Sequence, residues 1–152
     1  PPIARMLQAG IPVGAGTDAT RVASYNPWVS LSWMITGRTL GGTPLYPERS
    51  LLDRATALQL WTARNAWFSG EVGVKGQIAV GQLADLAVLS EDYFSVPESR
   101  LVEIHSELTV LGGRIVHADA SFREHDPPMP PILPDWSPVR TFGGYANPQG
   151  PS

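Results

Sequence analysis

Residues 10–19 read Gly-Ile-Pro-Val-Gly-Ala-Gly-Thr-Asp-Ala, and this stretch decides the fold. Ile11, Val13 and Ala15 are residues that suit a short buried strand, and Gly14 and Gly16 let the backbone pack closely or bend. Asp18 then stands at the carboxyl end of the predicted strand, which is where α/β proteins place their chemistry. An aspartate that caps an ordinary turn is the alternative, because Gly, Asp and Thr also cluster in turns.

Two later segments add to this pattern. Residues 75–86 read Lys-Gly-Gln-Ile-Ala-Val-Gly-Gln-Leu-Ala-Asp-Leu, and residues 108–116 read Leu-Thr-Val-Leu-Gly-Gly-Arg-Ile-Val. With residues 10–18, they resemble the C-terminal end of the amidohydrolase superfamily, in which the order is last barrel strand, exit segment and closing hairpin. The Asn26-Pro27-Trp28 helix start and the Pro-Asp-Trp-Ser-Pro sequence at 134–138 resemble the amidohydrolase-3, YtcJ-like branch.

The resemblance implies an α/β fold, namely the C-terminal fragment of a (β/α)8 TIM-like barrel with part of a small β-sandwich. On its own such a piece would look α+β. Residues 1–72 would form the last βα unit and terminal helices of the barrel, and 73–120 the C-terminal part of the sandwich. Residues 121–152 would be a proline-rich extended tail.

Length and composition limit the alternatives. A complete (β/α)8 barrel typically needs about 250 residues, whereas this chain has 152. Its net charge of −3 and single lysine give no basic stripe, which argues against a nucleic-acid partner. No apolar run reaches the roughly 18 residues of a membrane span. The chain has no cysteine, which excludes disulfides and thiolate metal sites and leaves the redox compartment undetermined. Its start lacks a signal-peptide pattern, so we expect a cut inside a longer chain and a cytoplasmic protein.

Helices are predicted over 2–8 and 27–36, and residues 51–67 are expected to be largely helical, with Thr62 as the point where a second short helix restarts and runs to Phe68. Asn26 is a good N-cap with Pro27 in the first helical position, and this helix should stop near Gly37. Ser50 with Asp53 three residues later resembles a capping box for the third helix.

The pattern changes near Gly70 from a helical to a strand-like one. Strands are predicted over 83–89, 108–111 and 114–117 in one sheet, with Gly112-Gly113 as the hairpin turn. Asp85, within an apolar strand, is expected to bond a turn or backbone group, since a buried unpaired charge is costly.

The resemblance implies that Asp18 is both a catalytic residue and a metal ligand, which orients the attacking water and moves its proton. The chain departs from many YtcJ-like relatives, which carry Trp-Pro after this aspartate where Ala19-Thr20-Arg21 stands here. Arg21 either reaches an anionic substrate or is a solvent-exposed loop residue. Trp28 either stacks on a substrate or packs in the core with Trp61 and Trp67.

The metal is expected to be zinc, or another divalent ion, in the full-length parent. The family's other ligands come from earlier strands that are outside this sequence. His105, His117 and His125 do not have the spacing of a ligand set and are interpreted as structural or exposed. We therefore expect no tightly bound metal and no activity in the fragment alone.

The sequence favours a piece of a metal-dependent amidohydrolase that cleaves a C–N bond, amide or formamide-like, in a small-molecule substrate. A non-catalytic scaffold or oligomerisation domain is the alternative. Because its apolar faces lack a partner, the chain should self-associate or pack on the missing N-terminal barrel.

Overall fold

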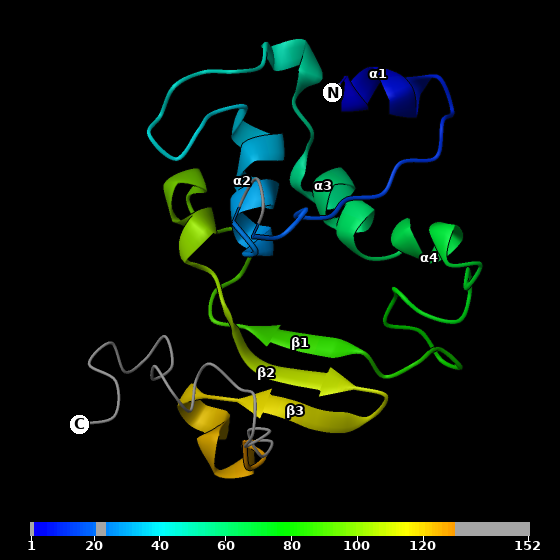
Figure 1. Cartoon of the computed structure of the whole chain (residues 1–152), viewed down its shortest axis with the longest axis vertical. Helices are drawn as coiled ribbons and strands as arrows, with labels where there is room; N and C mark the ends of the chain where they lie inside the picture. Colours follow the sequence, from blue (N-terminus) through cyan, green and yellow to red (C-terminus); the bar gives the residue numbers. More distant parts are fainter. Residues whose placement is uncertain (1, 21–23, 130–152) are drawn as a thin grey trace, which may run out of the picture.

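The computed structural model describes residues 2–20 and 24–129. Helices gather at one end of the molecule, and a small antiparallel sheet lies at the other (Figure 1). The α-helices are α1 (Ile3–Gln8), α2 (Pro27–Thr36), α3 (Arg54–Trp61) and α4 (Asn65–Phe68). The strands are β1 (Leu86–Leu89), β2 (Ser106–Leu111) and β3 (Arg114–Ala118), and the 3-10 helices are η1 (Glu48–Ser50), η2 (Glu98–Glu103) and η3 (Ala120–His125).

Helix α2 begins and ends where the sequence predicts. The Asn26 side chain accepts a hydrogen bond from the Trp28 N–H at 2.9 Å, and Pro27 occupies the first turn. At the other end Gly37 adopts a left-handed conformation, φ 66°, and donates its N–H to Trp33. Glycine is favoured at this position because it has no Cβ to clash.

Residues 51–67 contain two helices, α3 and α4, which confirms the predicted break near Thr62, but the predicted capping box at Ser50 is wrong. Asp53 is the N-cap of α3, accepting from the Thr56 N–H at 2.8 Å, whereas Ser50 ends η1. The Leu52 N–H donates to the Met34 carbonyl of α2 at 3.0 Å, and this tertiary bond keeps Leu52 out of a helical ladder. Thr62 has non-helical dihedrals and separates α3 from α4.

The sheet has the order β1-β2-β3, with both pairs antiparallel. Gly112 and Gly113 have φ angles of 56° and 78°, so the hairpin turn uses the left-handed backbone that glycine allows. Asp85 accepts the Gly112 N–H at 2.7 Å, which confirms its predicted backbone-bonding role. The first strand begins at Leu86 rather than at Leu83.

Buried side chains of α2, α3 and η2 form the core. Leu31, Leu60, Leu101 and Ile104 are its largest fully enclosed members. Arg54 at the start of α3 donates to the carbonyls of Tyr93 and Val96, and so ties the segment after β1 to the helices. None of the helices in the described part of the chain has the length and apolar character needed to cross a membrane.

The described part of the chain is thus a mixed fold of short helices and one small antiparallel sheet, which agrees with the predicted α+β appearance. Two expectations need correction. Residues 11–15 form no strand, because nothing in the described residues pairs with them as a neighbouring strand would. Residues 120–125 form η3, so an extended tail does not begin at 121, and residues 130–152 lie outside the described part.

Candidate active site

The segment that carries Asp18 runs from the end of α1 across to α3 and α4. Gly10, with φ 73°, ends α1, and the Ile11 N–H bonds back to the Met6 carbonyl at 3.0 Å. Ala15 is then held on both backbone groups. Its N–H donates to the Leu60 carbonyl at 2.9 Å, and its carbonyl accepts from Asn65 Nδ2 at 2.9 Å. The segment is therefore anchored by helices rather than by strands.

Gly14 makes this close approach possible. A Cβ at this position would lie 2.1 Å from Asn65 Oδ1 and 2.9 Å from a ring carbon of Phe68. A Cβ at Gly16 would meet nothing within 4 Å. Close packing is therefore confirmed at Gly14, whereas the space around Gly16 is open.

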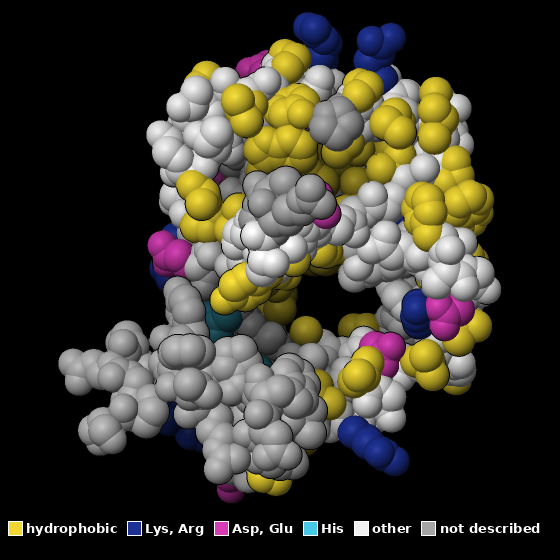
Figure 2. Space-filling view, in the orientation of Figure 1, with side chains coloured by type: hydrophobic (Ala, Val, Ile, Leu, Met, Phe, Trp, Pro, Cys, Tyr) yellow, Lys and Arg dark blue, Asp and Glu magenta, His cyan; other side chains and the backbone are white. Residues whose placement is uncertain are grey.

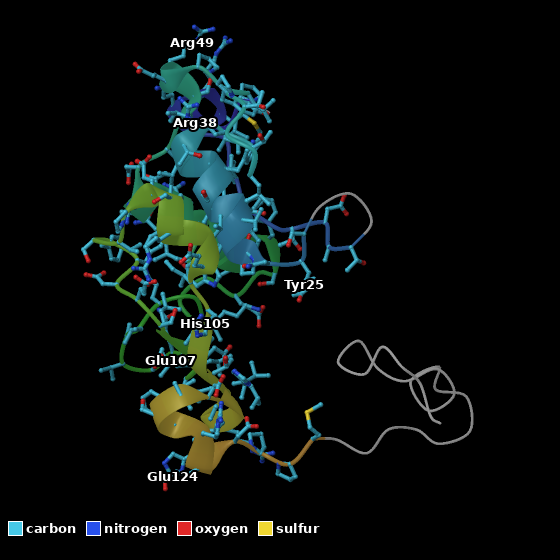
Figure 3. The ribbon with its side chains drawn as sticks, turned by 90° about the vertical axis from the view of Figure 1, so that its left-hand side faces the viewer. Tyr25, Arg38, Arg49, His105, Glu107 and Glu124 are labelled. Atoms are coloured by element: carbon cyan, nitrogen blue, oxygen red, sulfur yellow. The ribbon has the colours of Figure 1, made fainter. Side chains whose placement is uncertain are left out.

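Asp18 follows the anchored segment in an uncommon backbone conformation. Its φ is 53°, and that of Thr20 is 64°. Left-handed φ values are rare for non-glycine residues, although Asp tolerates them better than most, and they cluster at functional sites. The Asp18 side chain is exposed. Tyr25, a few residues later, lies at the side of the helical part of the molecule (Figure 3).

Of the two predicted substrate-binding residues, only Trp28 lies in the described part of the chain. Arg21 lies outside the described residues. Trp28 is half-buried in the first turn of α2, and its ring lies 6.0 Å from that of Tyr93 at 48°. It packs against the core cluster and also lines a hollow, so its position is compatible with both of the predicted roles.

That hollow has a volume of about 620 Å³ and lies between the helices and β1. Figure 2 shows the opening between the two ends of the molecule. Its walls are mainly apolar, from Trp28, Leu31, Leu58, Trp61, Ile78, Leu86 and Leu89. Neither Asp18 nor any histidine lines it. The hollow therefore brings apolar surface together, and the predicted catalytic residue is not among its lining residues.

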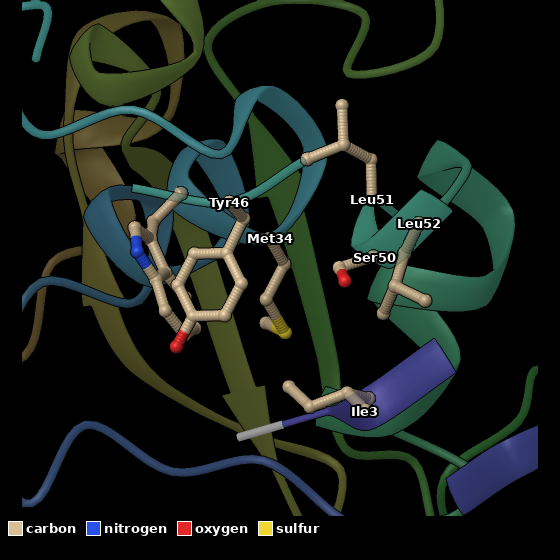
Figure 4. Close-up of a pocket in the computed structure, with 7 residues that line it drawn as sticks. Ile3, Met34, Tyr46, Ser50, Leu51 and Leu52 are labelled. Carbon is tan, nitrogen blue, oxygen red and sulfur yellow. The ribbon is translucent and has the colours of Figure 1, made fainter. Parts of the chain in front are cut away.

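A second hollow, of about 890 Å³, lies beside α2 and η2, and neither Asp18 nor any histidine lines it. The pocket in Figure 4, between Ile3, Met34, Tyr46 and Leu52, has a volume of about 10 Å³. That is room for one water molecule at most. It cannot admit a substrate.

The described residues contain no cluster of three or more His, Asp or Glu side chains that could hold a metal. The three histidines are exposed, as predicted. His105 Nδ1 lies 3.2 Å from the Glu103 carbonyl oxygen, and His117 Nδ1 lies 3.8 Å from Asp126 Oδ1. Since zinc sites normally use three or four protein ligands, Asp18 can supply one ligand, and the described residues do not complete a site.

Three residues that support the fold, Tyr93, Asp53 and Asp92, have shifted pKa values. Burial raises the pKa of the Tyr93 hydroxyl to about 12. Hydrogen bonds from Thr56 lower the pKa of Asp53, and the Phe94 N–H is the main cause of the lowered pKa of Asp92. These carboxylates cap a helix and a turn.

Sequence reasoning did not single out Asn65, whose side chain holds the segment before Asp18. Gly14 was a partial indication of this contact, since a glycine in an apolar stretch often marks the close approach of another group. The partner of that approach lies 51 positions away in the sequence, and only the fold identifies it.

Comparisons with known proteins agree with the order of these segments. The Amidohydrolase family matches residues 1–117. The Bacillus subtilis (strain 168) protein YtcJ, named as an amidohydrolase, is 27% identical over 114 residues, which are 74% of this chain and 21% of that protein. An amidohydrolase crystal structure from Thermotoga maritima MSB8 superimposes with a TM-score of 0.53 at 21% identity, over 76% of this chain and 25% of that one.

The chain thus spans about a fifth to a quarter of the length of these two relatives. At this identity the structural likeness concerns the fold alone. The family match covers most of the chain, including the Asp18 segment, the exit segment and the closing hairpin. The chain therefore belongs to the amidohydrolase family.

Proposed function

We propose that this chain is the C-terminal part of a metal-dependent hydrolase that cleaves a C–N bond, amide or formamide-like, and that Asp18 is its contribution to the reaction. The observation that carries the proposal is the exposed position of the Asp18 side chain at the end of an anchored segment. Its carboxylate is exposed on a left-handed backbone, directly after a segment anchored by Leu60 and Asn65. This segment lies within the residues that match the family.

An exposed carboxylate suits two tasks in such a hydrolysis. It can accept a proton from the attacking water and return it to the leaving amine, and a positioned group of this kind typically contributes about 10²–10⁴-fold. It is also an oxygen ligand for a divalent ion, for which we propose zinc. Such an ion lowers the pKa of bound water towards neutrality.

The other ligands must come from outside the described residues, because the described residues offer no ligand cluster. We therefore propose that the isolated chain is inactive and retains no zinc tightly. Arg21, close to Asp18 in sequence, is proposed as a contact for an anionic substrate group. Trp28 is proposed as an apolar contact at the start of α2.

The test uses the full-length protein that carries this chain. N-acetyl and N-formyl amino acids and amines are offered as substrates, and release of the free amine is measured. We expect Asp18→Asn to lower turnover at least about 100-fold with an unchanged melting temperature, because an amide is a poor base.

Asp85→Asn is the matched control, since the amide oxygen can still accept the Gly112 N–H. It should leave turnover unchanged. Near-normal turnover in Asp18→Asn would reduce Asp18 to a turn residue. A wild-type protein that hydrolyses none of these compounds would instead support the scaffold or oligomerisation alternative.

A further inference from the structure

We infer that Asn65 is a positioning residue for Asp18, acting through the backbone of residues 14–16, an inference that rests on the proposed function of Asp18. Asn65 is the first residue of α4, and it is half-buried. Its Nδ2 donates to the Ala15 carbonyl at 2.9 Å, across 50 positions of sequence. Its side chain also lines the hollow between the helices and β1, but its Nδ2 is bonded to the Ala15 carbonyl, so we assign its effect to the backbone that it holds.

The hydrogen bond is one half of a two-sided clamp. The Leu60 carbonyl, in the last turn of α3, accepts the Ala15 N–H at 2.9 Å. Both backbone groups of Ala15 are therefore fixed by the α3–α4 junction. In a barrel strand these groups would pair with neighbouring strands, whereas here an amide side chain and a helix carbonyl bind them.

The fit around Gly14 shows that the position of the Asn65 side chain is specific. A Cβ on Gly14 would come within 2.1 Å of Asn65 Oδ1, so the carboxamide fills the space that the glycine leaves. Gly14 lies outside the left-handed region, and its requirement is therefore one of space rather than of φ. Glycine and asparagine thus form a matched pair across the two segments.

Only two residues separate Ala15 from Asp18, and Asp18 has a left-handed φ of 53°. A residue in such a conformation persists only where the surrounding structure determines it. The clamp on Ala15 fixes where the chain enters this conformation. Loosening the clamp should let Asp18 sample ordinary conformations, which would point its carboxylate elsewhere.

The first experiment measures amide hydrogen exchange of residues 11–18 in the 152-residue chain, so it does not depend on activity or on metal. Asn65→Leu keeps a similar volume but removes the donor. Gly14→Ala adds a Cβ that would clash with Asn65 Oδ1 and displace its side chain. Both should accelerate exchange of the Ala15 amide about tenfold, as expected for the loss of one hydrogen bond that leaves a carbonyl unpaired. Gly16→Ala is the matched control, because nothing lies within 4 Å of its added Cβ.

The second experiment measures the Zn²⁺ dissociation constant of the full-length protein by competition with a chromophoric chelator. Asn65→Leu should weaken Zn²⁺ binding about tenfold, and Asp18→Asn, the reference, should weaken it at least as much. A purely structural role for Asn65 would lower the melting temperature without changing the affinity of the folded protein.

The outcomes separate the two ideas. Unchanged exchange in Asn65→Leu overturns the clamp, whatever the protein catalyses. Wild-type Zn²⁺ affinity in Asn65→Leu, beside a loss in Asp18→Asn, overturns the positioning role and leaves the proposed function standing. A wild-type protein that binds no Zn²⁺ overturns both the metal proposal and the positioning of a ligand, even if the exchange result holds.

Discussion

Arg54→Met should be one of the most destabilising single substitutions outside the apolar core. The Arg54 guanidinium donates to the carbonyls of Tyr93 and Val96, the latter at 2.6 Å, and the Tyr93 hydroxyl donates back to the Arg54 carbonyl at 2.9 Å. Tyr93 and Val96 are buried, with 2% and 5% of their surfaces exposed. Arg54 thus connects the start of α3 to the segment that follows β1.

The magnitude follows from these contacts. Methionine preserves much of the apolar stem of arginine, so the loss is mainly that of two hydrogen bonds from a charged donor. Each such bond contributes about 1.5–3 kcal/mol. Because Arg54 is only half-buried, water can replace part of this, and we expect a loss of about 2–4 kcal/mol in the free energy of unfolding. That is a large fraction of the roughly 5–15 kcal/mol that stabilises a typical domain.

The assay is urea unfolding of the 152-residue chain followed by tryptophan fluorescence. Tyr93→Phe is the comparison, because it removes the hydroxyl bond to Arg54 but keeps both bonds from the guanidinium, and it should cost about 1 kcal/mol. If the free energy of unfolding of Arg54→Met is within about 0.5 kcal/mol of the wild-type value, the range of ordinary surface changes, the connection does not stabilise the fold.

Three further results are expected. Asp85→Ala removes the acceptor for the Gly112 N–H and should cost about 1 kcal/mol in urea unfolding, with the loss absent in Asp85→Asn. Acid should destabilise the chain, because the pKa values of Asp53 and Asp92 are lowered in the folded state. Their contribution to the free energy of unfolding is complete above the usual carboxyl pKa and is lost as the pH falls through the lowered values. A melting series from pH 6 to pH 2 checks this, and Asp53→Ala should flatten the acid limb. Finally, the isolated chain should self-associate through its exposed apolar side chains, at β1 or on the helices, since Val88 and Phe68 are 42% and 57% exposed; sedimentation at several concentrations that finds only monomer would contradict this.

The sequence predicts best those elements whose signals are local. Asn26 and Pro27 sit next to the helix they start, and Gly37 directly follows the helix it ends. The Gly112-Gly113 turn likewise specifies its own left-handed backbone. In each case the residue that causes the structure lies within one turn of it, so pattern reasoning has all the information that it needs.

Where pattern reasoning failed, a contact from a distant part of the chain decided the outcome. Ser50 and Asp53 are both acceptable caps, and the bond from the Leu52 N–H to the Met34 carbonyl selects Asp53. Residues 11–15 have the apolar pattern of a strand, but a strand exists only when another strand pairs with it, and here helix groups take those bonds. The same distant contacts, from Leu60 and Asn65, are the ones that fix the chain before Asp18. The candidate catalytic residue could therefore be identified from the sequence, whereas the residues that hold it in place could be identified only from the fold.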